Sequence, residues 1–247
     1  NILAPVESLI LQKNIPSNFR DPENYWFGFS VRARVLAYSK DRTKLTELST
    51  YEDLQNSKWR GRIAVRSSSN IYNQSLMASM IEENGEEKAY EGAKAIRENM
   101  VRAPRGNDRD QIRAVASGLA DIAIINTYYI GKLANSKDPK DREVAKKVSI
   151  FFPNQSNRGT HVNISGGGLI KTSKNKEDAI KFLEFLSKSE AQAIFGNVNY
   201  EYPVNIENNQ SELLKSWGKF KFDKINMSIL GERNSQAVKI FDKAGWE

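Results

Sequence analysis

The sequence predicts an α/β fold in which helices cover a largely parallel sheet. Short runs rich in β-branched residues, such as GRIAV, DIAII and VSIFF, alternate with amphipathic patterns such as EDAIKFLEFLSKSEAQAIF. This alternation is typical of buried strands that are each followed by a covering helix. Two longer segments, WFGFSVRARVLAYS and THVNISGGGLIKTS, alternate over enough residues to form long strands that can cross between lobes.

The length and composition allow a substantial core. The chain has 247 residues, of which 39% are hydrophobic, enough for one large or two medium domains. No run of eighteen apolar residues occurs, so we expect no membrane span. The opening NILAPVES has neither the basic nor the apolar region of a signal peptide, so it does not decide where the protein is located.

The first residues predict little regular structure. Residues 1–24 contain three prolines and suggest a short helix over residues 6–12, followed by an irregular loop. No convincing strand precedes Trp26, although an α/β domain usually begins with one. The pattern therefore predicts that the chain enters its fold late.

A strand and a helix then bring the first tyrosine of interest to a strand end. After a capped helical turn in STYEDL, residues 62–65 read as a buried strand. The segment RSSSN follows directly, and all four of its Ser and Asn residues are favourable N-caps. The helix NIYNQSLMASMIEEN then has Tyr72 in its first turn.

A second strand and helix repeat this arrangement. A helix in KAYEGAKAIRENM, the loop APRGND and an amphipathic helix ending at Gly118 lead to a buried strand over residues 121–125. Thr127 is positioned to cap the next helix, which places Tyr128 and Tyr129 in its first turn. A charged hairpin of helices in KDPKDREVAKK, the strand VSIFF, the long strand containing GGG, a helix, an extended turn at Pro203 and two further helices complete the chain.

Charge and rare residues exclude several functions. The net charge of +7 comes from basic residues scattered among acidic ones, and no groove-binding or base-stacking motif accompanies it, so we expect no nucleic-acid partner. The absence of cysteine excludes disulfides and thiolate metal sites. A single histidine, His161, excludes any site that needs two imidazoles. Any metal must therefore be held mainly by oxygen ligands.

Three other features favour structural interpretations. The run Gly166–Gly168 lacks the spacing of a phosphate-binding loop and is better explained by close strand packing. His161 has no recognisable Ser-His-acid order around it. The serines at 67–69 have no evident general base, so helix capping or anion binding at a helix N-terminus explains them more economically.

The tyrosines favour a metal-binding interpretation. Tyr72, Tyr128 and Tyr129 all fall at the carboxyl ends of predicted strands, where ligands collect in open α/β sheets. A phenolate is a hard anionic oxygen donor suited to Fe(III). Three unrelated, half-buried tyrosines remain an alternative, because tyrosine is often partly buried.

These motifs also carry a family resemblance over essentially the whole chain. The stretches WFGFSVRARVLAY, STYEDLQNSKWRGRI, RSSSNIYNQSL, DIAIINTYYIGKL, FFPNQSNRGTHVNISGGG and YEYPVN closely resemble the ferric-ion-binding proteins of bacterial iron ABC importers, especially the cyanobacterial branch. The resemblance implies the two-lobed periplasmic-binding-protein fold of class α/β, with two crossing strands at the hinge and Fe(III) in the interlobe cleft. It further implies a periplasmic monomer that is not an enzyme and that delivers iron to a membrane permease.

The resemblance assigns roles to four residues. Tyr128 and Tyr129 match the paired iron phenolates, and Tyr72 matches the additional tyrosine ligand of the branch that uses several. Arg32 matches a cleft arginine, which would offset negative charge or hold an anion or water near the metal.

The family pattern also predicts a division of the chain into lobes. Residues 1–36 and 163–207 match the N-terminal lobe, whereas residues 37–162 and 208–247 match the C-terminal lobe that carries the tyrosines. Relatives have a segment before the one matching NILAPVES, which carries the first strands and a further Tyr or His ligand. We therefore expect the front part of the N-terminal lobe to be absent from this chain.

Three functional hypotheses follow. The leading one is a ferric-iron receptor that captures Fe(III) through tyrosinates. The first alternative is a receptor of the same fold for an anion or small organic solute, in which the tyrosines stack or form hydrogen bonds. The second is an enzyme with Tyr129 as general acid/base and Arg32 as an oxyanion partner, which lacks any visible pKa-matched group beside the tyrosine.

Overall fold

The computed structural model describes residues 2–204 and 211–246, and the chain separates into two compact units. Unit 1 comprises Asn1–Arg32, Val162–Lys219 and Lys224–Ser228, and unit 2 comprises Ala33–His161, Phe220–Asp223 and Ile229–Glu247. The chain passes from unit 1 to unit 2 within strand β2 (Phe27–Ser39), and it returns directly before strand β6 (Val162–Gly167).

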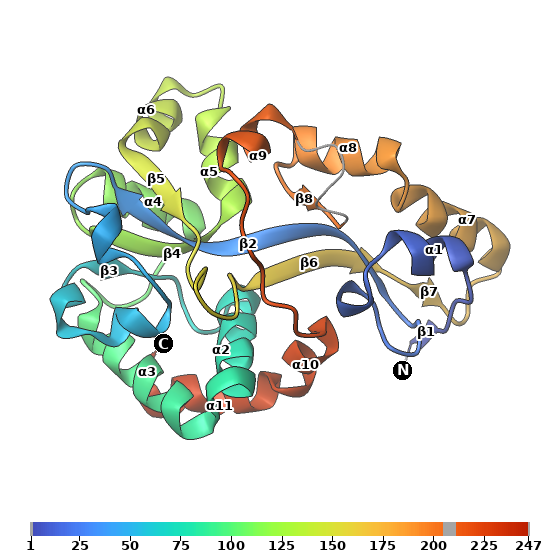
Figure 1. The fold of residues 1–247 in the computed structure, drawn as a ribbon, viewed down its shortest axis with the longest axis horizontal. Coiled ribbons are helices and arrows are strands. Elements are labelled where there is room, and N and C mark those ends of the chain that lie inside the picture. Colours follow the sequence, from blue (N-terminus) through green and yellow to red (C-terminus); the bar gives the residue numbers. More distant parts are fainter. Residues whose placement is uncertain (1, 205–210, 247) are drawn as a thin grey trace. The chain divides into compact units, whose positions relative to one another are not determined.

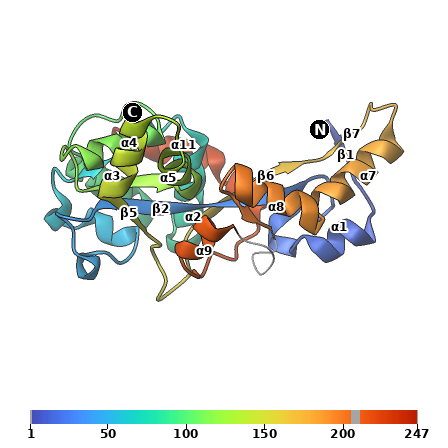
Figure 2. The same cartoon turned by 90° about the horizontal axis from the view of Figure 1, so that it is seen from above.

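Unit 1 is built on the first half of β2. Strands β6 and β8 both pair with β2, and a separate two-stranded ladder joins β1 to β7. Figure 2 shows α7 and α8 following one another along this unit. The further elements of unit 1 are β1 (Leu3–Ala4), α1 (Leu9–Asn14), β7 (Leu169–Ile170), α7 (Lys176–Leu186), α8 (Ser189–Val198), β8 (Tyr202–Pro203) and α9 (Glu212–Ser216).

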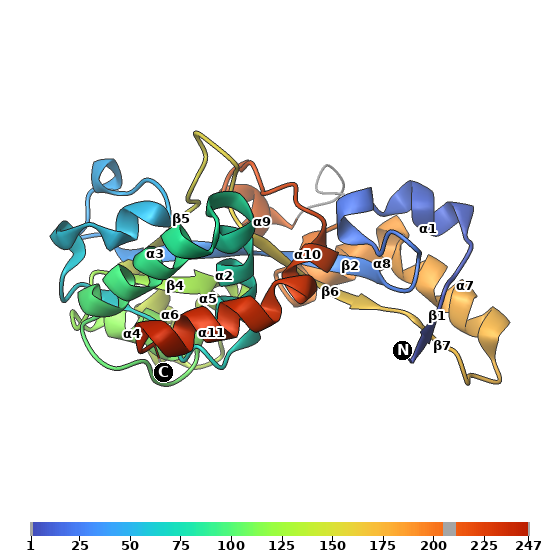
Figure 3. The same cartoon turned by 90° about the horizontal axis from the view of Figure 1, so that it is seen from below.

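Unit 2 contains a sheet of order β3-β4-β2-β5. Helices α2, α3 and α11 pack against one another, as Figures 1 and 3 show. The elements of unit 2 are β3 (Ile63–Ala64), α2 (Ile71–Asn84), α3 (Glu86–Asn99), α4 (Asp108–Ala116), β4 (Ile122–Asn126), α5 (Thr127–Ala134), α6 (Pro139–Lys147), β5 (Val148–Phe151) and α11 (Asn234–Ala244). Helix α10 (Met227–Glu232) begins in unit 1 and ends in unit 2. Short 3₁₀ helices occur at Ser17–Phe19, Leu45–Glu47, Glu52–Gln55 and Ser57–Trp59.

The prediction of a largely parallel sheet is wrong for unit 2. Only β3 and β4 are parallel, whereas β2 runs antiparallel to both β4 and β5. Strand β2 lies between these two neighbours, with Leu36 facing both Ile124 and Phe151 in the register. An apolar run indicates burial on both faces, but it does not specify strand direction, so the sequence pattern could not reveal this reversal.

The core of unit 2 surrounds this central ladder. Every residue of β4 is buried, as are the β2 residues from Ala33 to Ser39. Trp59 and Tyr51 are among the largest fully buried side chains, and the Tyr51 hydroxyl donates a hydrogen bond to the Arg34 carbonyl oxygen. Apolar burial on this scale supplies most of the free energy that holds the unit together.

Two elements near the chain start differ from the prediction. A strand does precede Trp26, because Leu3–Ala4 pairs with β7, although two residues are too few for an alternating pattern to be recognised. The first helix begins after Ser8, whose hydroxyl accepts a hydrogen bond from the Leu11 backbone amide at 3.2 Å. It therefore begins three residues later than the predicted start at residue 6.

Glycines explain the form of the second long strand. It is divided into β6 and β7 at Gly168. A Cβ atom at Gly166 would overlap the carbonyl oxygen of Phe27, and one at Gly168 would overlap that of Tyr25. The interpretation as close strand packing is confirmed at these two glycines, whereas Gly167 makes only ordinary contacts of 3.6 Å.

The chain after residue 210 is shared between the units. The predicted division placed residues 208–247 in the lobe with the tyrosines, whereas residues up to Lys219, and Lys224–Ser228, group with unit 1. Trp217 lies against Tyr202, with ring centroids 6.4 Å apart, and the Asn226 amide donates to the carbonyl oxygens of Ser17 and Arg20. Residues 205–210 of the predicted division lie outside the described residues.

Candidate metal centre

The three predicted tyrosines lie in the first turns of two helices of unit 2. Tyr72 is the second residue of α2, and Tyr128 and Tyr129 are the second and third residues of α5. These helices follow β3 and β4, which are parallel neighbours, so both helices begin at the same edge of the sheet. The predicted first-turn positions are confirmed.

Local capping determines where these helices begin. The Asn70 side chain accepts a hydrogen bond from the Tyr72 backbone amide at 3.0 Å, which starts α2 as predicted. The predicted Thr127 cap of α5 is wrong, because α5 begins at Thr127 and has no side-chain cap. Instead, the Thr127 hydroxyl accepts from the Ala33 amide of β2 at 3.3 Å, which ties the helix start to the central strand.

The structure brings the three phenols together. The hydroxyl oxygens of Tyr72 and Tyr128 are 3.3 Å apart, and the rings of Tyr128 and Tyr129 lie with their centroids 4.1 Å apart. Tyr128 is only 7% exposed, whereas the other two are partly exposed. The three tyrosines therefore form one cluster, as the metal-binding interpretation requires.

Burial affects the acidity of the central phenol. It raises the pKa of Tyr128 above its ordinary value, and hydrogen bonding and charge from Tyr129 and Tyr72 raise it further. Tyr128 is thus a neutral phenol at neutral pH when no metal is bound. A cation that coordinates this oxygen as phenolate must displace its proton.

Four cationic side chains lie against the phenol rings. The guanidinium carbons of Arg34 and Arg66 lie 5.9 and 5.8 Å from the Tyr72 ring centroid. Two further cations face the other rings, Arg109 at 5.9 Å from Tyr129 and Lys132 at 5.0 Å from Tyr128. Among these four cations, only Lys132 lies four residues from the tyrosine that it contacts, Tyr128, in the same helix. The sequence alone could therefore predict only this contact.

A buried ion network supports Tyr72. Arg34 and Asp108 are fully buried and paired at 2.7 Å, and Arg66 contacts the other carboxylate oxygen of Asp108 at 3.2 Å. Arg34 also donates to the Asn73 side-chain oxygen at 2.6 Å, while the Asn126 backbone amide donates to Asp108 at 2.8 Å. The network joins β2, α2, α4 and β4, and sequence reasoning missed it because its members are distant along the chain.

Arg32 lies in unit 1, where its contacts are with β6 and the β8 region. It donates to the Ser165 hydroxyl at 2.6 Å and to the Ile164 carbonyl oxygen at 3.0 Å, and it pairs with Glu201 at 3.4 Å. Its predicted role near a bound metal stays a prediction.

Other metal donors are few. Among residues 2–204 and 211–246, no group of three or more His, Cys, Asp or Glu side chains is arranged to hold a metal ion. His161 is fully buried, and its Nε2 lies 3.2 Å from the Ser75 hydroxyl. Burial, and then the charges of Arg158 and Arg34, lower its pKa. The neutral, buried imidazole supports the structural interpretation of this residue.

An α/β fold with a cluster of tyrosines at one edge of the sheet is typical of a ligand-binding protein. A family model described as bacterial extracellular solute-binding protein matches residues 1–226. The chain therefore belongs to this family of solute-binding proteins. The prediction that it is not an enzyme is confirmed, since its relatives are binding proteins.

Similar proteins narrow the class. A solved structure from Trichodesmium, described as IdiA or FutA in complex with iron and citrate, is 53% identical and superposes with a TM-score of 0.98, covering 100% of this chain and 78% of that one. Iron uptake protein A1 of Synechocystis sp. PCC 6803 is 49% identical over 100% of this chain and 68% of its own length. Apo FutA2 of the same organism is 45% identical, with a TM-score of 0.96 over 99% of this chain and 78% of that one.

These similarities confirm the predicted resemblance to the cyanobacterial ferric-ion-binding proteins and the predicted fold class. The fold is the mixed α/β architecture of that family, including the binding protein of Campylobacter jejuni at a TM-score of 0.94. Within the described residues, no helix is both long and apolar enough to span a membrane.

Proposed function

We propose that this protein captures Fe(III) through the phenolate oxygens of Tyr72, Tyr128 and Tyr129. The observation that carries the proposal is the convergence of the three phenols at one sheet edge, with two hydroxyl oxygens 3.3 Å apart. That spacing allows one small cation to contact both oxygens. Hard anionic oxygen donors suit a hard trivalent ion. The iron and citrate bound to the similar Trichodesmium protein support the same ligand class.

The phenolates and the cations beside them would have different roles in iron binding. Three phenolates would supply a charge of −3 to the iron. The cationic side chains that face the rings would offset part of this negative charge when iron is bound. The Asp108 network holds Arg34 and Arg66 beside Tyr72. Arg32 would offset residual charge or hold an anion or water near the metal.

The cargo is then passed on. A binding protein of this family delivers its ligand to the membrane permease of an ABC importer, and we propose that this chain does so with iron, as a monomer in the periplasm. The match to a family of bacterial extracellular solute-binding proteins supports this proposal.

A receptor for an anion or small organic solute is the alternative. It would use the same tyrosines for stacking and hydrogen bonds rather than coordination. Changing Tyr128 and Tyr129 to Phe separates the two functions, because Phe keeps the ring but loses the oxygen.

The test is equilibrium iron binding, measured by competition with a chelator for wild type and for the Y128F/Y129F variant. Loss of two of three coordinating oxygens should abolish measurable Fe(III) binding while circular dichroism shows an intact fold. Near-wild-type iron affinity in the folded variant would refute coordination by this pair.

A further inference from the structure

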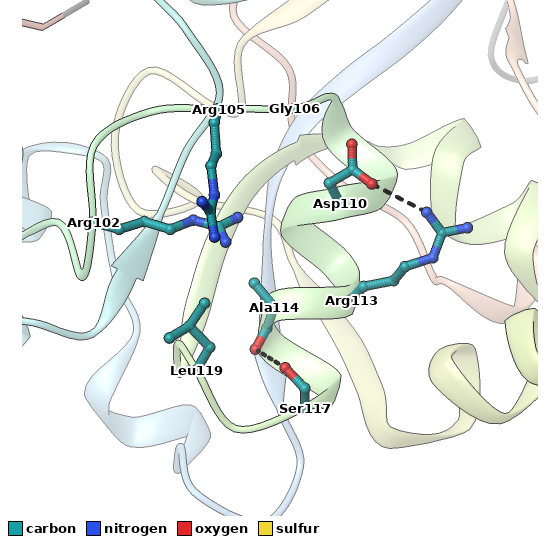
Figure 4. Close-up of a pocket in the computed structure, with 8 residues that line it drawn as sticks. All are labelled: Arg102, Arg105, Gly106, Asp110, Arg113, Ala114, Ser117 and Leu119. Carbon is teal, nitrogen blue, oxygen red and sulfur yellow. Dashed lines mark hydrogen bonds and ion pairs between the residues drawn. The ribbon is translucent and has the colours of Figure 1, made fainter.

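A cavity lined by several arginines lies in unit 2, beside α4 rather than at the tyrosine cluster. Its volume is about 440 Å³, within the range of small-molecule sites. Arg102 and Arg105, in the loop between α3 and α4, approach it from one side, and Asp110 and Arg113 approach it from α4, as Figure 4 shows. None of these four side chains takes part in the contacts described above for the phenols.

The charges around this cavity are unequally compensated. Arg113 pairs with Asp110 at 3.2 Å and with Asp141 at 2.9 Å. Asp110 is further engaged, because it accepts from the Asn107 backbone amide at 2.8 Å. In contrast, no ion pair joins Arg102 or Arg105 to a carboxylate in the part of the chain that the structure describes. Arg102 and Arg105 therefore line the cavity without an ion pair of their own, and the charge of Asp110 offsets that of Arg102 only in part.

The two arginines also face one another. Their guanidinium groups converge in Figure 4. Arg102 Nη2 donates to the Gln111 side-chain oxygen at 3.3 Å, but its Nε is buried and has no hydrogen-bond partner among the described residues. Burial, and then the charge of Arg105, lower the pKa of Arg102, and the opposing charge of Asp110 has a smaller effect. A bound anion would offset the repulsion between the two guanidinium groups and could accept a hydrogen bond from Arg102 Nε.

The loop that carries the arginines is held in place. The Gln111 side-chain amide donates to the Arg105 carbonyl oxygen at 2.6 Å and to the Asn107 carbonyl oxygen at 3.0 Å. The Asn107 side chain accepts from the Arg109 backbone amide at 2.9 Å and thereby caps α4. The two guanidinium groups thus stand on a fixed backbone, which lowers the entropic cost of binding a ligand.

We propose that this cavity is a binding site for a small multivalent oxyanion, a phosphate or a polycarboxylate, held by Arg102 and Arg105. The planar guanidinium group presents paired N–H donors that match the oxygens of both ligand types. The site is separate from the proposed iron site and does not depend on it.

The test is calorimetric titration of the metal-free protein with inorganic phosphate and, separately, with tricarballylate, a tricarboxylate without the hydroxyl group of citrate. Saturable binding of either probe is expected, weakening as salt is raised to about 0.15 M. The R102Q/R105Q variant should bind about tenfold or more weakly, because each charge-assisted hydrogen bond contributes about one order of magnitude. The matched control R60Q, at an exposed arginine elsewhere in unit 2, should bind as wild type does.

The two probes identify the ligand class, since binding of phosphate alone indicates an inorganic oxyanion and binding of tricarballylate alone a carboxylate. No binding of either probe, or equal affinity in wild type and R102Q/R105Q, would overturn the proposal. Iron titration of R102Q/R105Q is expected to match wild type, so failure here leaves the iron proposal intact.

Discussion

Asp108 pairs with both of the arginines, Arg34 and Arg66, that lie against the Tyr72 ring. Its carboxylate contacts Arg34 at 2.7 Å and Arg66 at 3.2 Å, and it is fully buried. A buried arginine that loses its only carboxylate partner is left as an uncompensated charge, which costs far more than the intact pair contributes.

We therefore predict that Asp108→Ala lowers the free energy of unfolding by about 3–5 kcal/mol, measured by urea denaturation. Asp108→Asn keeps acceptor capacity and should lose less. Glu143→Ala, which removes an exposed i,i+3 pair with Lys146, should leave the urea midpoint unchanged. Equal midpoints for D108A and wild type would show that the network does not stabilise the unit.

His161 gives the protein a distinct pH response. Its pKa in the folded protein lies below the value of 6.5 expected of an exposed histidine. Below about pH 6.5 the unfolded chain is therefore protonated at this residue, whereas the folded chain stays neutral there until the pH reaches the lower, folded pKa. Stability is unaffected above about pH 6.5 and is lost as pH falls below it, by up to about 1.4 kcal/mol per pH unit, until the folded pKa is reached.

The measurement is urea unfolding between about pH 7.5 and 5.5, a range above the ordinary carboxylate pKa values. Wild type should lose stability over this range, and the His161→Gln variant, which keeps a hydrogen-bonding side chain beside Ser75, should lose much less. Parallel curves for the two proteins would mean that another group causes the response.

Single residues also show where sequence reasoning stops. The positions of Tyr72, Tyr128 and Tyr129 were predicted, because strand-then-helix patterns are local and helix first turns can be counted from the strand ends. Arg34 and Asp108 were missed, because they are 74 positions apart and nothing local distinguishes a buried arginine in a strand from a surface one.

At the scale of elements, β6 packs closely against β2. Gly166 lies where any Cβ would overlap the Phe27 carbonyl oxygen, whereas a Cβ at Gly167 would meet Leu183 and Phe29 at 3.6 Å. Backbone cannot yield as a flexible side chain can. Gly166→Ala should therefore destabilise the protein by about 1–3 kcal/mol, and Gly167→Ala should be close to neutral.

Thermal unfolding of the two alanine variants measures this difference directly. If G166A melted at the same temperature as G167A, the close approach of β2 and β6 would not be a stabilising feature.

Most elements were predicted in approximate place, but not in direction, and two predictions of helix number were wrong. The charged segment forms the single helix α6 rather than a hairpin of helices, and α9, α10 and α11 follow Pro203 in the described residues where two helices were expected. Local sequence patterns located α2, α4, β2 and β4, since each pattern can be recognised within its own segment. The antiparallel placement of β2 against β4 and the two-residue β1 escaped prediction, because both depend on pairing with residues far along the chain. Thr127 was misassigned as a cap for the same reason, as its hydroxyl is used by Ala33.

For the molecule as a whole, a ligand that binds only the folded state must stabilise it. Fe(III) supplied as its citrate complex should raise the melting temperature of wild type. At a free metal concentration a thousandfold above Kd, the free energy of unfolding should increase by about 4 kcal/mol. The Y72F/Y128F/Y129F variant should show no shift. A shift of equal size in this variant would place the metal elsewhere in the chain.

The central claim is that tyrosine oxygens coordinate the iron, and visible absorption tests it most directly. Adding ferric citrate to the metal-free protein at neutral pH should produce an orange to purple phenolate-to-iron charge-transfer band that saturates at one iron per chain and is lost in Y128F/Y129F. A folded wild-type protein that binds Fe(III) without such a band would contradict phenolate coordination.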